Sequence, residues 1–203
     1  MSRVSVFIDG FNLYYGLRAK HDRKYLWLDL VEVSRRLLRP GQELVGVHYF
    51  TAAVRNDPVS QRNQRVYLDA LRSWGELDIV LGHYQEKHNA CQECAATWRT
   101  YEEKETDVNI AVALVAAGVR DHFDTAILLS ADGDLLPGVR TLKQFAPDKR
   151  VVVIFPPRRR SDELRRVSDG SFTVSDAILR QSLLPDEFSG EDGRRHRRPE
   201  RWH

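Results

Sequence analysis

The chain has 203 residues, of which 42% are hydrophobic and 30% charged, and its formal net charge is +2. This length allows one good-sized core, and the composition is that of a globular protein. The apolar run at the N-terminus is short and ends at Asp9, so neither a signal peptide nor a membrane span is expected. With only Cys91 and Cys94 present, a disulfide framework is excluded, and a cytoplasmic location is expected.

Short apolar runs alternate with helical patterns in the first half of the chain. In chain order, the expected elements are a strand at 4–8, helices at 11–18 and 28–38, a strand at 44–52, a helix at 61–74 and a strand at 77–82. Residues 83–103 are polar, lack a clear period and contain both cysteines, so they are interpreted as an insertion.

The same alternation continues in the second half. The expected elements are a helix at 107–117, a strand at 125–130, a helix at 135–145, a strand at 150–155, a short helix at 161–167, an edge strand at 172–174 and a helix at 175–184. Residues 1–185 are therefore expected to form one domain. Residues 186–203 are rich in arginine and are predicted to form a disordered basic tail.

Strands that alternate with helices of this length predict an α/β fold with a mostly parallel central sheet flanked by helices on both faces. In such sheets, ligands bind beyond the carboxyl ends of the strands. That edge is where functional side chains are expected.

Acidic and amide side chains stand at this edge. Asp9 directly follows the first strand and Asn12 lies three residues further on, while Asp132 and Asp134 follow the strand at 125–130. Asp107 sits in the first turn of its helix, on the same stripe as apolar residues that must face the core. Each acid taken alone could be a helix cap or part of a turn. Taken together, acids that converge on one edge predict a metal site.

Carboxylate and water oxygens are the ligands that Mg²⁺ and Mn²⁺ prefer. One ion, or two held about 4 Å apart, would activate a water and stabilise the leaving oxygen of a phosphodiester. The sequence therefore predicts metal-assisted phosphodiester hydrolysis, with Mg²⁺ or Mn²⁺ as the cofactor.

Three motifs resemble the NYN domain in its LabA-like branch, which belongs to the PIN-like nuclease group: VFIDGFNLYYGLR, KETDVNIAVAL and AILLSADGDLLPGVRTLKQFAPDKRVVVIFPP. The resemblance covers about residues 4–168 and implies a three-layer α/β fold with a metal-dependent ribonuclease site. It implies that Asp9, Asp107, Asp132 and Asp134 bind metal, that Asn12 is their companion amide, and that Ser130 is the hydroxyl residue that orients the third acid. Glu105 lies off the Asp107 stripe and ranks second to it.

A second metal is suggested by the Cys91-x-x-Cys94 pair, which is half of a zinc site. His83 and His88 lie close enough in sequence to complete a structural zinc site. A homodimer that shares one zinc ion and a loop with reduced cysteines are the alternatives.

Basic residues flank the expected acidic edge and would attract phosphate to a locally negative pocket. The candidates for nucleic-acid binding are Arg18, Arg55, Lys104, Arg158, Arg159 and Arg160. Solvated surface charge is the alternative for all of them. Tyr14, Tyr15, Trp27 and Trp98 could stack on bases, although aromatic residues at such spacings are more often part of the core.

The leading functional hypothesis is a metal-dependent endoribonuclease that acts on single-stranded or structured RNA. The alternative is a non-catalytic RNA-binding or regulatory module that keeps the acids for folding or for metal-assisted binding. A phosphatase of the haloacid-dehalogenase type is disfavoured because the second aspartate is missing two residues after Asp9. A dinucleotide-binding role is disfavoured because no GxGxxG follows the first strand.

Overall fold

The computed structural model describes residues 1–55, 57–90, 94, 97–190 and 193–202. Its main sheet contains the strands β1 (Ser2–Asp9), β2 (Gln42–Ala52), β3 (Asp78–Ala90), β4 (Thr97–Lys104), β5 (Thr125–Leu129), β6 (Arg150–Phe155) and β7 (Gly170–Thr173). Their order in space is β4-β3-β2-β1-β5-β6-β7, and neighbouring strands are parallel except for β3 and β4. The predicted α/β fold with a mostly parallel sheet is confirmed.

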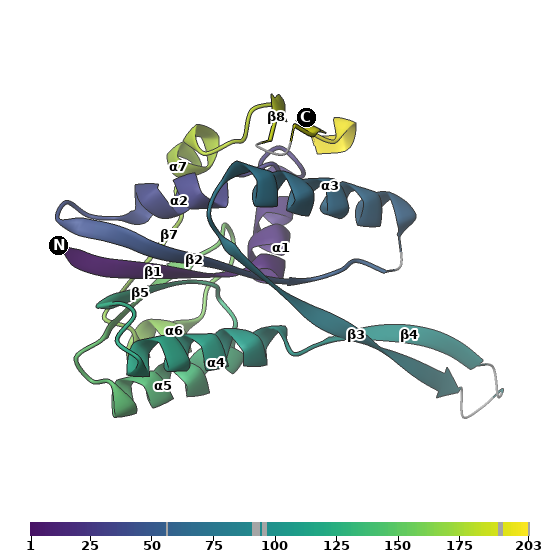
Figure 1. Cartoon of the computed structure of the whole chain (residues 1–203). Helices are drawn as coiled ribbons and strands as arrows, with labels where there is room; N and C mark the ends of the chain where they lie inside the picture. The colour runs from purple at the N-terminus through teal and green to yellow at the C-terminus, as the bar shows by residue number, and fades with distance from the viewer. Residues whose placement is uncertain (56, 91–93, 95–96, 191–192, 203) are drawn as a thin grey trace.

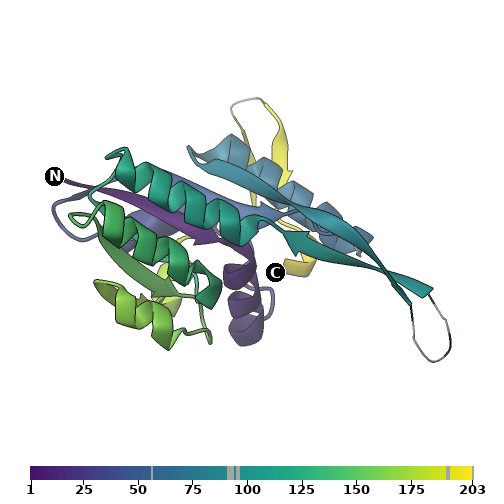
Figure 2. The same ribbon diagram turned by 90° about the horizontal axis from the view of Figure 1, so that it is seen from below.

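Helices cover both faces of this sheet (Figure 1). One face carries α1 (Gly10–His21), α2 (Leu30–Leu37), α3 (Pro58–Trp74) and α7 (Asp176–Gln181), and the other carries α4 (Thr106–Val119), α5 (Leu136–Phe145) and α6 (Asp162–Val167). Seen from below, α4 and α5 lie side by side across the strands (Figure 2). Among the described residues, no helix has both the length and the apolar character that a bilayer span requires.

The two faces of β1 face two separate hydrophobic clusters, because successive side chains of a strand point to opposite sides. Ile8 packs in the cluster beneath α1, α2 and α3, which also holds Trp27. Phe7 packs in the cluster beneath α4 and α5, together with Phe50. This double burial explains the continuous apolar run in β1 and fixes where Asp9 leaves the sheet.

Much of the predicted insertion at 83–103 belongs to the strands β3 and β4. β3 continues past the parallel sheet to Ala90 and pairs with β4 in an antiparallel ladder that runs from His83 opposite Lys104 to Ala90 opposite Thr97. The two strands project from the body of the protein (Figure 1). The sequence of these two strands carries no clear apolar period, so the ladder could not be recognised from the sequence.

The C-terminal residues also differ from the predicted disordered tail. They form a small hairpin of β8 (Glu187–Ser189) and β9 (Arg195–Arg197), followed by a short 3-10 helix, η2 (Glu200–Trp202). Trp202 is only 8% exposed and packs edge-on against Trp27 and Tyr67. Arg198 donates hydrogen bonds to the backbone carbonyls of Lys24 and Trp202. Burial of one aromatic ring and one arginine orders a segment whose overall composition suggests disorder.

A polar network ties the start of β1 to the start of β5, at the edge of the sheet opposite the carboxyl ends. The Arg3 guanidinium donates to both Asp121 and Asp124, and the Arg3 N–H donates to Asp124 Oδ2 at 2.7 Å. The hydrogen bonds from Arg3 lower the pKa of Asp124 to about 2.

Asp124→Asn is expected to lower the thermal midpoint modestly at pH 7, and the difference from wild type should vanish as the pH falls toward 2. A depressed pKa in the folded state means that the stabilisation is present above the pKa of the unfolded chain and is lost as pH falls through the folded value. Thermal unfolding between pH 2 and pH 7 measures this difference. A constant difference in midpoint between wild type and Asp124→Asn across that range would contradict the lowered pKa of Asp124.

Candidate metal centre

Asp9 is the last residue of β1 and caps the N-terminus of α1. Its Oδ1 accepts the backbone N–H of Asn12 at 2.9 Å, and its Oδ2 accepts the hydroxyl of Ser130 at 2.7 Å. The side chain is only 2% exposed. The two hydrogen bonds fix the direction of a carboxylate that would otherwise be costly to bury.

A second set of hydrogen bonds holds the loop after β5 against α1. The side-chain oxygen of Asn12 accepts the N–H of Ala131 at 3.1 Å, and Ser130 Oγ accepts the N–H of Asp132 at 3.0 Å. Ser130 therefore contacts both Asp9 and the backbone of Asp132. The predicted companion amide and the predicted orienting hydroxyl both lie within this network.

Three carboxylates meet beyond the carboxyl ends of β1 and β5. Asp9, Asp107 and Asp132 each offer one oxygen, and these oxygens lie within 4.8 Å of one another. They come from the end of β1, the first turn of α4 and the loop after β5. Ile110 and Leu114 on the same helix are buried at 0% and 1% exposure, which turns Asp107 toward the sheet.

Burial raises the pKa of Asp9, and the nearby charge of Asp132 raises it further, while the hydrogen bonds from Asn12 and Ser130 oppose the shift. Two like charges about 4 Å apart repel by roughly 4 kcal/mol at an effective dielectric constant near 20. A divalent cation would remove both penalties. Three carboxylate oxygens fit Mg²⁺ or Mn²⁺, which would complete their octahedral shells with water and substrate oxygens.

Tyr49 on β2 lies beside this centre and was not singled out from the sequence. Burial raises the pKa of its phenol to about 12, with a further contribution from the charge of Asp9. The phenol is neutral at pH 7, as an unperturbed tyrosine also is. Tyrosine in a strand normally indicates only core packing, so the sequence carried no signal for this position.

Asp134 and Glu105 lie outside the group of three carboxylates. Asp134 is exposed, and its backbone N–H donates to Asp132 Oδ1 at 3.0 Å. Glu105 adopts a φ of 77° at the N-cap of α4, and its Oε2 lies 3.0 Å from His83 Nδ1. Glu163, which the sequence did not single out, lies near the loop after β5: its Oε2 is 3.5 Å from the position that a Cβ atom would occupy at Gly133.

The four residues of the predicted zinc site are described to different extents. Cys91 lies outside the described residues, and His88 is placed only by its register opposite Arg99 in the β3–β4 ladder. Cys94 is an exposed free cysteine, and His83 pairs with Glu105. The structural zinc site remains a prediction.

The predicted nucleic-acid-binding residues occupy different environments. Arg159 lies over the Tyr15 ring, with its Cζ 5.7 Å from the centre of the ring. Arg55 lines a cavity next to α1. Arg18 pairs with Asp22, and Arg160 with Asp162. Arg158 is exposed, and Lys104, which ends β4, is half-buried.

Ser130→Ala is expected to destabilise the metal-free protein by about 1–3 kcal/mol, because it leaves a buried carboxylate oxygen of Asp9 without its donor. Chemical denaturation measures this loss. Mn²⁺ affinity should fall by about 10- to 100-fold, as is typical when a partner of a metal ligand is removed. Ser189→Ala, at an exposed serine of β8, is the matched control. An unchanged Mn²⁺ affinity in Ser130→Ala would show that the hydroxyl does not position the ligands.

These features define an α/β protein in which three carboxylates converge at the carboxyl edge of a mostly parallel sheet. The family described as the NYN domain matches residues 3–176, and the chain belongs to this family. The sequence-based recognition is thereby confirmed.

Known proteins and solved structures that are similar to the chain include the following. The low amplitude and bright protein LabA of Synechococcus elongatus is 26% identical over 92% of each chain. The 6-hydroxy-3-succinoylpyridine 3-monooxygenase HspA of Pseudomonas putida is 27% identical over 76% of this chain, which spans only 59% of that protein. A protein of unknown function from Vibrio parahaemolyticus has the same fold, with a TM-score of 0.60, 22% identity and coverage of 90% of this chain and 96% of that one.

Proposed function

We propose that the chain is a metal-dependent ribonuclease that hydrolyses RNA phosphodiesters internally. The observation that carries the proposal is the convergence of Asp9, Asp107 and Asp132, from three separate segments, to within 4.8 Å. Membership of the NYN domain family, whose members are generally nucleases, supports the same function.

Each side chain has a distinct role in this proposal. Asp9, Asp107 and Asp132 would hold Mg²⁺ or Mn²⁺, and Asp134, at the exposed rim, would be a fourth acid for the same ion. When bound, the cation supplies an activated water and stabilises the charge that develops on the phosphate. Ser130 and Asn12 keep the carboxylates and the β5 loop in place. Arg18, Arg55, Lys104 and Arg158–Arg160 attract the phosphate backbone.

The test is incubation of purified protein with labelled single-stranded RNA, structured RNA and single-stranded DNA, with Mn²⁺, with Mg²⁺ or with EDTA. Cleavage by the wild type with metal is expected, and Asp132→Asn should lose it. Asp69→Asn, an exposed carboxylate on α3, is the matched control and should cut normally. RNA binding without cleavage under either metal would refute the enzyme and support the non-catalytic RNA-binding module.

A further inference from the structure

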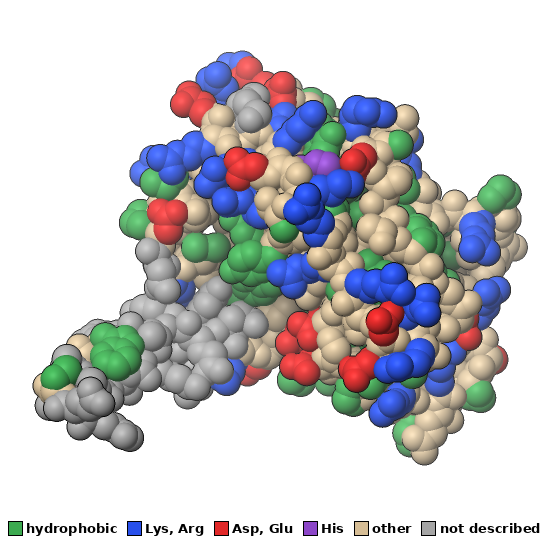
Figure 3. All heavy atoms as spheres, turned by 180° about the vertical axis from the view of Figure 1, so that it is seen from behind, with side chains coloured by type: hydrophobic (Ala, Val, Ile, Leu, Met, Phe, Trp, Pro, Cys, Tyr) green, Lys and Arg blue, Asp and Glu red, His purple; other side chains and the backbone are tan. Residues whose placement is uncertain are grey.

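A cavity of about 400 Å³ lies between α1, α3 and η2, on the face of the sheet opposite α4. This volume falls within the range of about 300–1,000 Å³ that is typical of sites for small ligands. Seen from behind, hydrophobic side chains reach the surface near the middle of the molecule, and lysine and arginine side chains lie next to them (Figure 3). We call this cavity the aromatic pocket.

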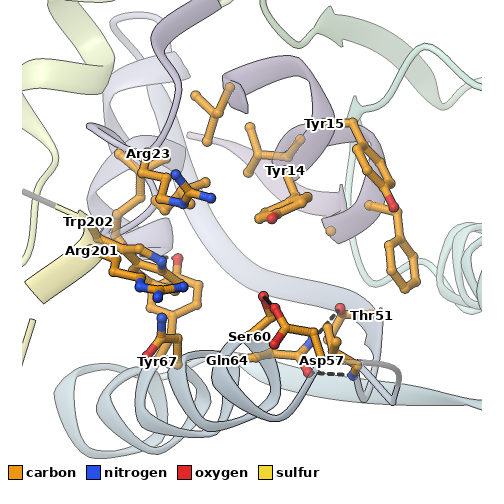
Figure 4. A pocket seen from close by; sticks show the side chains of 18 of the residues that line it. Tyr14, Tyr15, Arg23, Thr51, Asp57, Ser60, Gln64, Tyr67, Arg201 and Trp202 are labelled. Atoms are coloured by element: carbon orange, nitrogen blue, oxygen red, sulfur yellow. Dashed lines mark hydrogen bonds between the residues drawn. The ribbon is translucent and has the colours of Figure 1, made fainter. Parts of the chain in front are cut away.

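Aromatic rings form much of the wall of the aromatic pocket. Tyr14 and Tyr15 of α1 approach from one side, while Tyr67 of α3 and Trp202 lie on the other (Figure 4). Tyr67 is fixed, because its hydroxyl donates to the carbonyl of Leu28 at 2.8 Å and its ring packs edge-on against Trp202. Rings held in this way offer flat apolar surfaces to a planar ligand at little cost in conformational entropy.

The charges that line the pocket favour an anion. Three arginines, Arg23, Arg55 and Arg201, face a single acid, Asp57. Asp57 is already engaged, because it accepts the N–H of Val59 and the hydroxyl of Ser60 at the start of α3. Within the described part of the chain, neither Arg55 nor Arg201 forms an ion pair or a hydrogen bond. The hydrogen bond from Ser60 lowers the pKa of Asp57, and Arg201 lies close enough for its charge to lower that pKa further. The guanidinium groups of Arg55 and Arg201 keep their N–H donors for a phosphate.

One lining amide is free to recognise the edge of a ring. The Gln64 amide is occupied, because it accepts the N–H of Val54 and donates to the carbonyl of Ala52. Asn63 also lines the pocket, and its amide has no partner among the described residues. An unpaired amide next to aromatic walls offers one donor and one acceptor to a heterocycle.

We propose that the aromatic pocket binds a nucleotide, with the base between the aromatic rings, its edge on Asn63 and the phosphate on Arg55 and Arg201. The pocket adjoins the metal centre, since Gly10 and Tyr49 line it while Asp9 directly precedes Gly10. The nucleotide can be part of an RNA strand or a free mononucleotide. The proposal that the nucleotide belongs to an RNA strand rests on the proposed nuclease function. The proposal that the pocket binds a nucleotide does not.

The test is a calorimetric titration of the full chain in EDTA with AMP, CMP, GMP and UMP, next to adenosine and ribose 5-phosphate. At least one mononucleotide is expected to bind more tightly than either fragment. The double variant Arg55→Ala/Arg201→Ala should weaken this binding by about tenfold or more, and Asn63→Ala should change the preference among bases. Arg62→Ala, an exposed arginine of α3 outside the pocket, should bind as wild type does. Absence of binding by all four mononucleotides, or equal binding by the double variant and Arg62→Ala, would overturn the proposal.

A second experiment distinguishes a nucleotide of an RNA strand from a free mononucleotide. It uses the Asp132→Asn protein, which should bind RNA without cutting it. If the pocket holds a nucleotide of the strand, the double arginine variant will bind a short single-stranded RNA more weakly, and mononucleotides will compete with that RNA. If the pocket holds a free nucleotide, RNA binding will be unchanged while mononucleotide binding is lost. Both results support a nucleotide pocket, and the titration in EDTA is independent of whether the chain cleaves RNA.

Discussion

Asp9→Asn is expected to reduce metal-dependent RNA cleavage by about 10³-fold or more, without lowering the stability of the metal-free protein. Asp9 is the most buried of the three converging carboxylates. The neutral amide oxygen of asparagine binds a divalent cation more weakly than this carboxylate oxygen does. The amide oxygen can still accept the N–H of Asn12, so the cap of α1 is retained.

The stability of the metal-free proteins follows from the direction of the pKa shift. Burial raises the pKa of Asp9 in the folded protein, so its contribution to stability is greatest below the unfolded value of about 3.9 and is lost as pH rises through the folded value. Asparagine does not ionise, so the variant does not lose stability in this way as the pH rises. The stability of Asp9→Asn relative to wild type should therefore increase from acidic to neutral pH.

Thermal unfolding from pH 4 to pH 8, in EDTA and in Mn²⁺, measures both effects. Mn²⁺ should raise the midpoint of the wild type at neutral pH and leave that of Asp9→Asn unchanged. Asp69→Asn should respond to Mn²⁺ as the wild type does. An equal Mn²⁺ response in wild type and Asp9→Asn would place the cation elsewhere.

The sequence was sufficient to predict the convergence of the acids because it depends on topology. Asp9 and Asp132 each follow a strand that is buried on both faces, and parallel strands bring their carboxyl ends to one edge. The apolar stripe of α4 placed Asp107 there and left Glu105 outside. Asp134 could not be placed in the same way, because a short 3-10 turn, Gly133–Leu135, sets its direction.

The aromatic pocket could not be predicted because it depends on long-range packing. Trp202 reaches its position only because the C-terminal segment folds back onto Trp27 and Tyr67. In the sequence, this tryptophan is a single apolar residue among arginines, so the basic composition of the segment led to the prediction of disorder. The same limit hid the β3–β4 ladder, because it is defined by backbone pairing between two segments whose sequences have no clear apolar period.

Gly10→Ala is expected to destabilise the protein by about 1–3 kcal/mol and to impair cleavage, although alanine is the better helix former. A methyl group at Gly10 would lie 2.6 Å from the carbonyl oxygen of Phe50, 2.9 Å from Tyr49 Cε2 and 3.0 Å from Thr51 Cβ. The carbonyl belongs to a strand paired on both sides, so it cannot move away as a flexible side chain would. The start of α1 must shift instead, and Asp9 shifts with it.

Denaturant unfolding in EDTA and cleavage assays with Mn²⁺ measure the two consequences of Gly10→Ala. Gly170→Ala is the matched control, because a methyl group there would meet nothing within 4 Å, and it should leave both measurements near wild type. Excess Mn²⁺ should restore part of the activity, since cation binding favours the conformation that brings the carboxylates together. If Gly10→Ala is as stable and as active as Gly170→Ala, the contact between α1 and β2 does not set the position of Asp9.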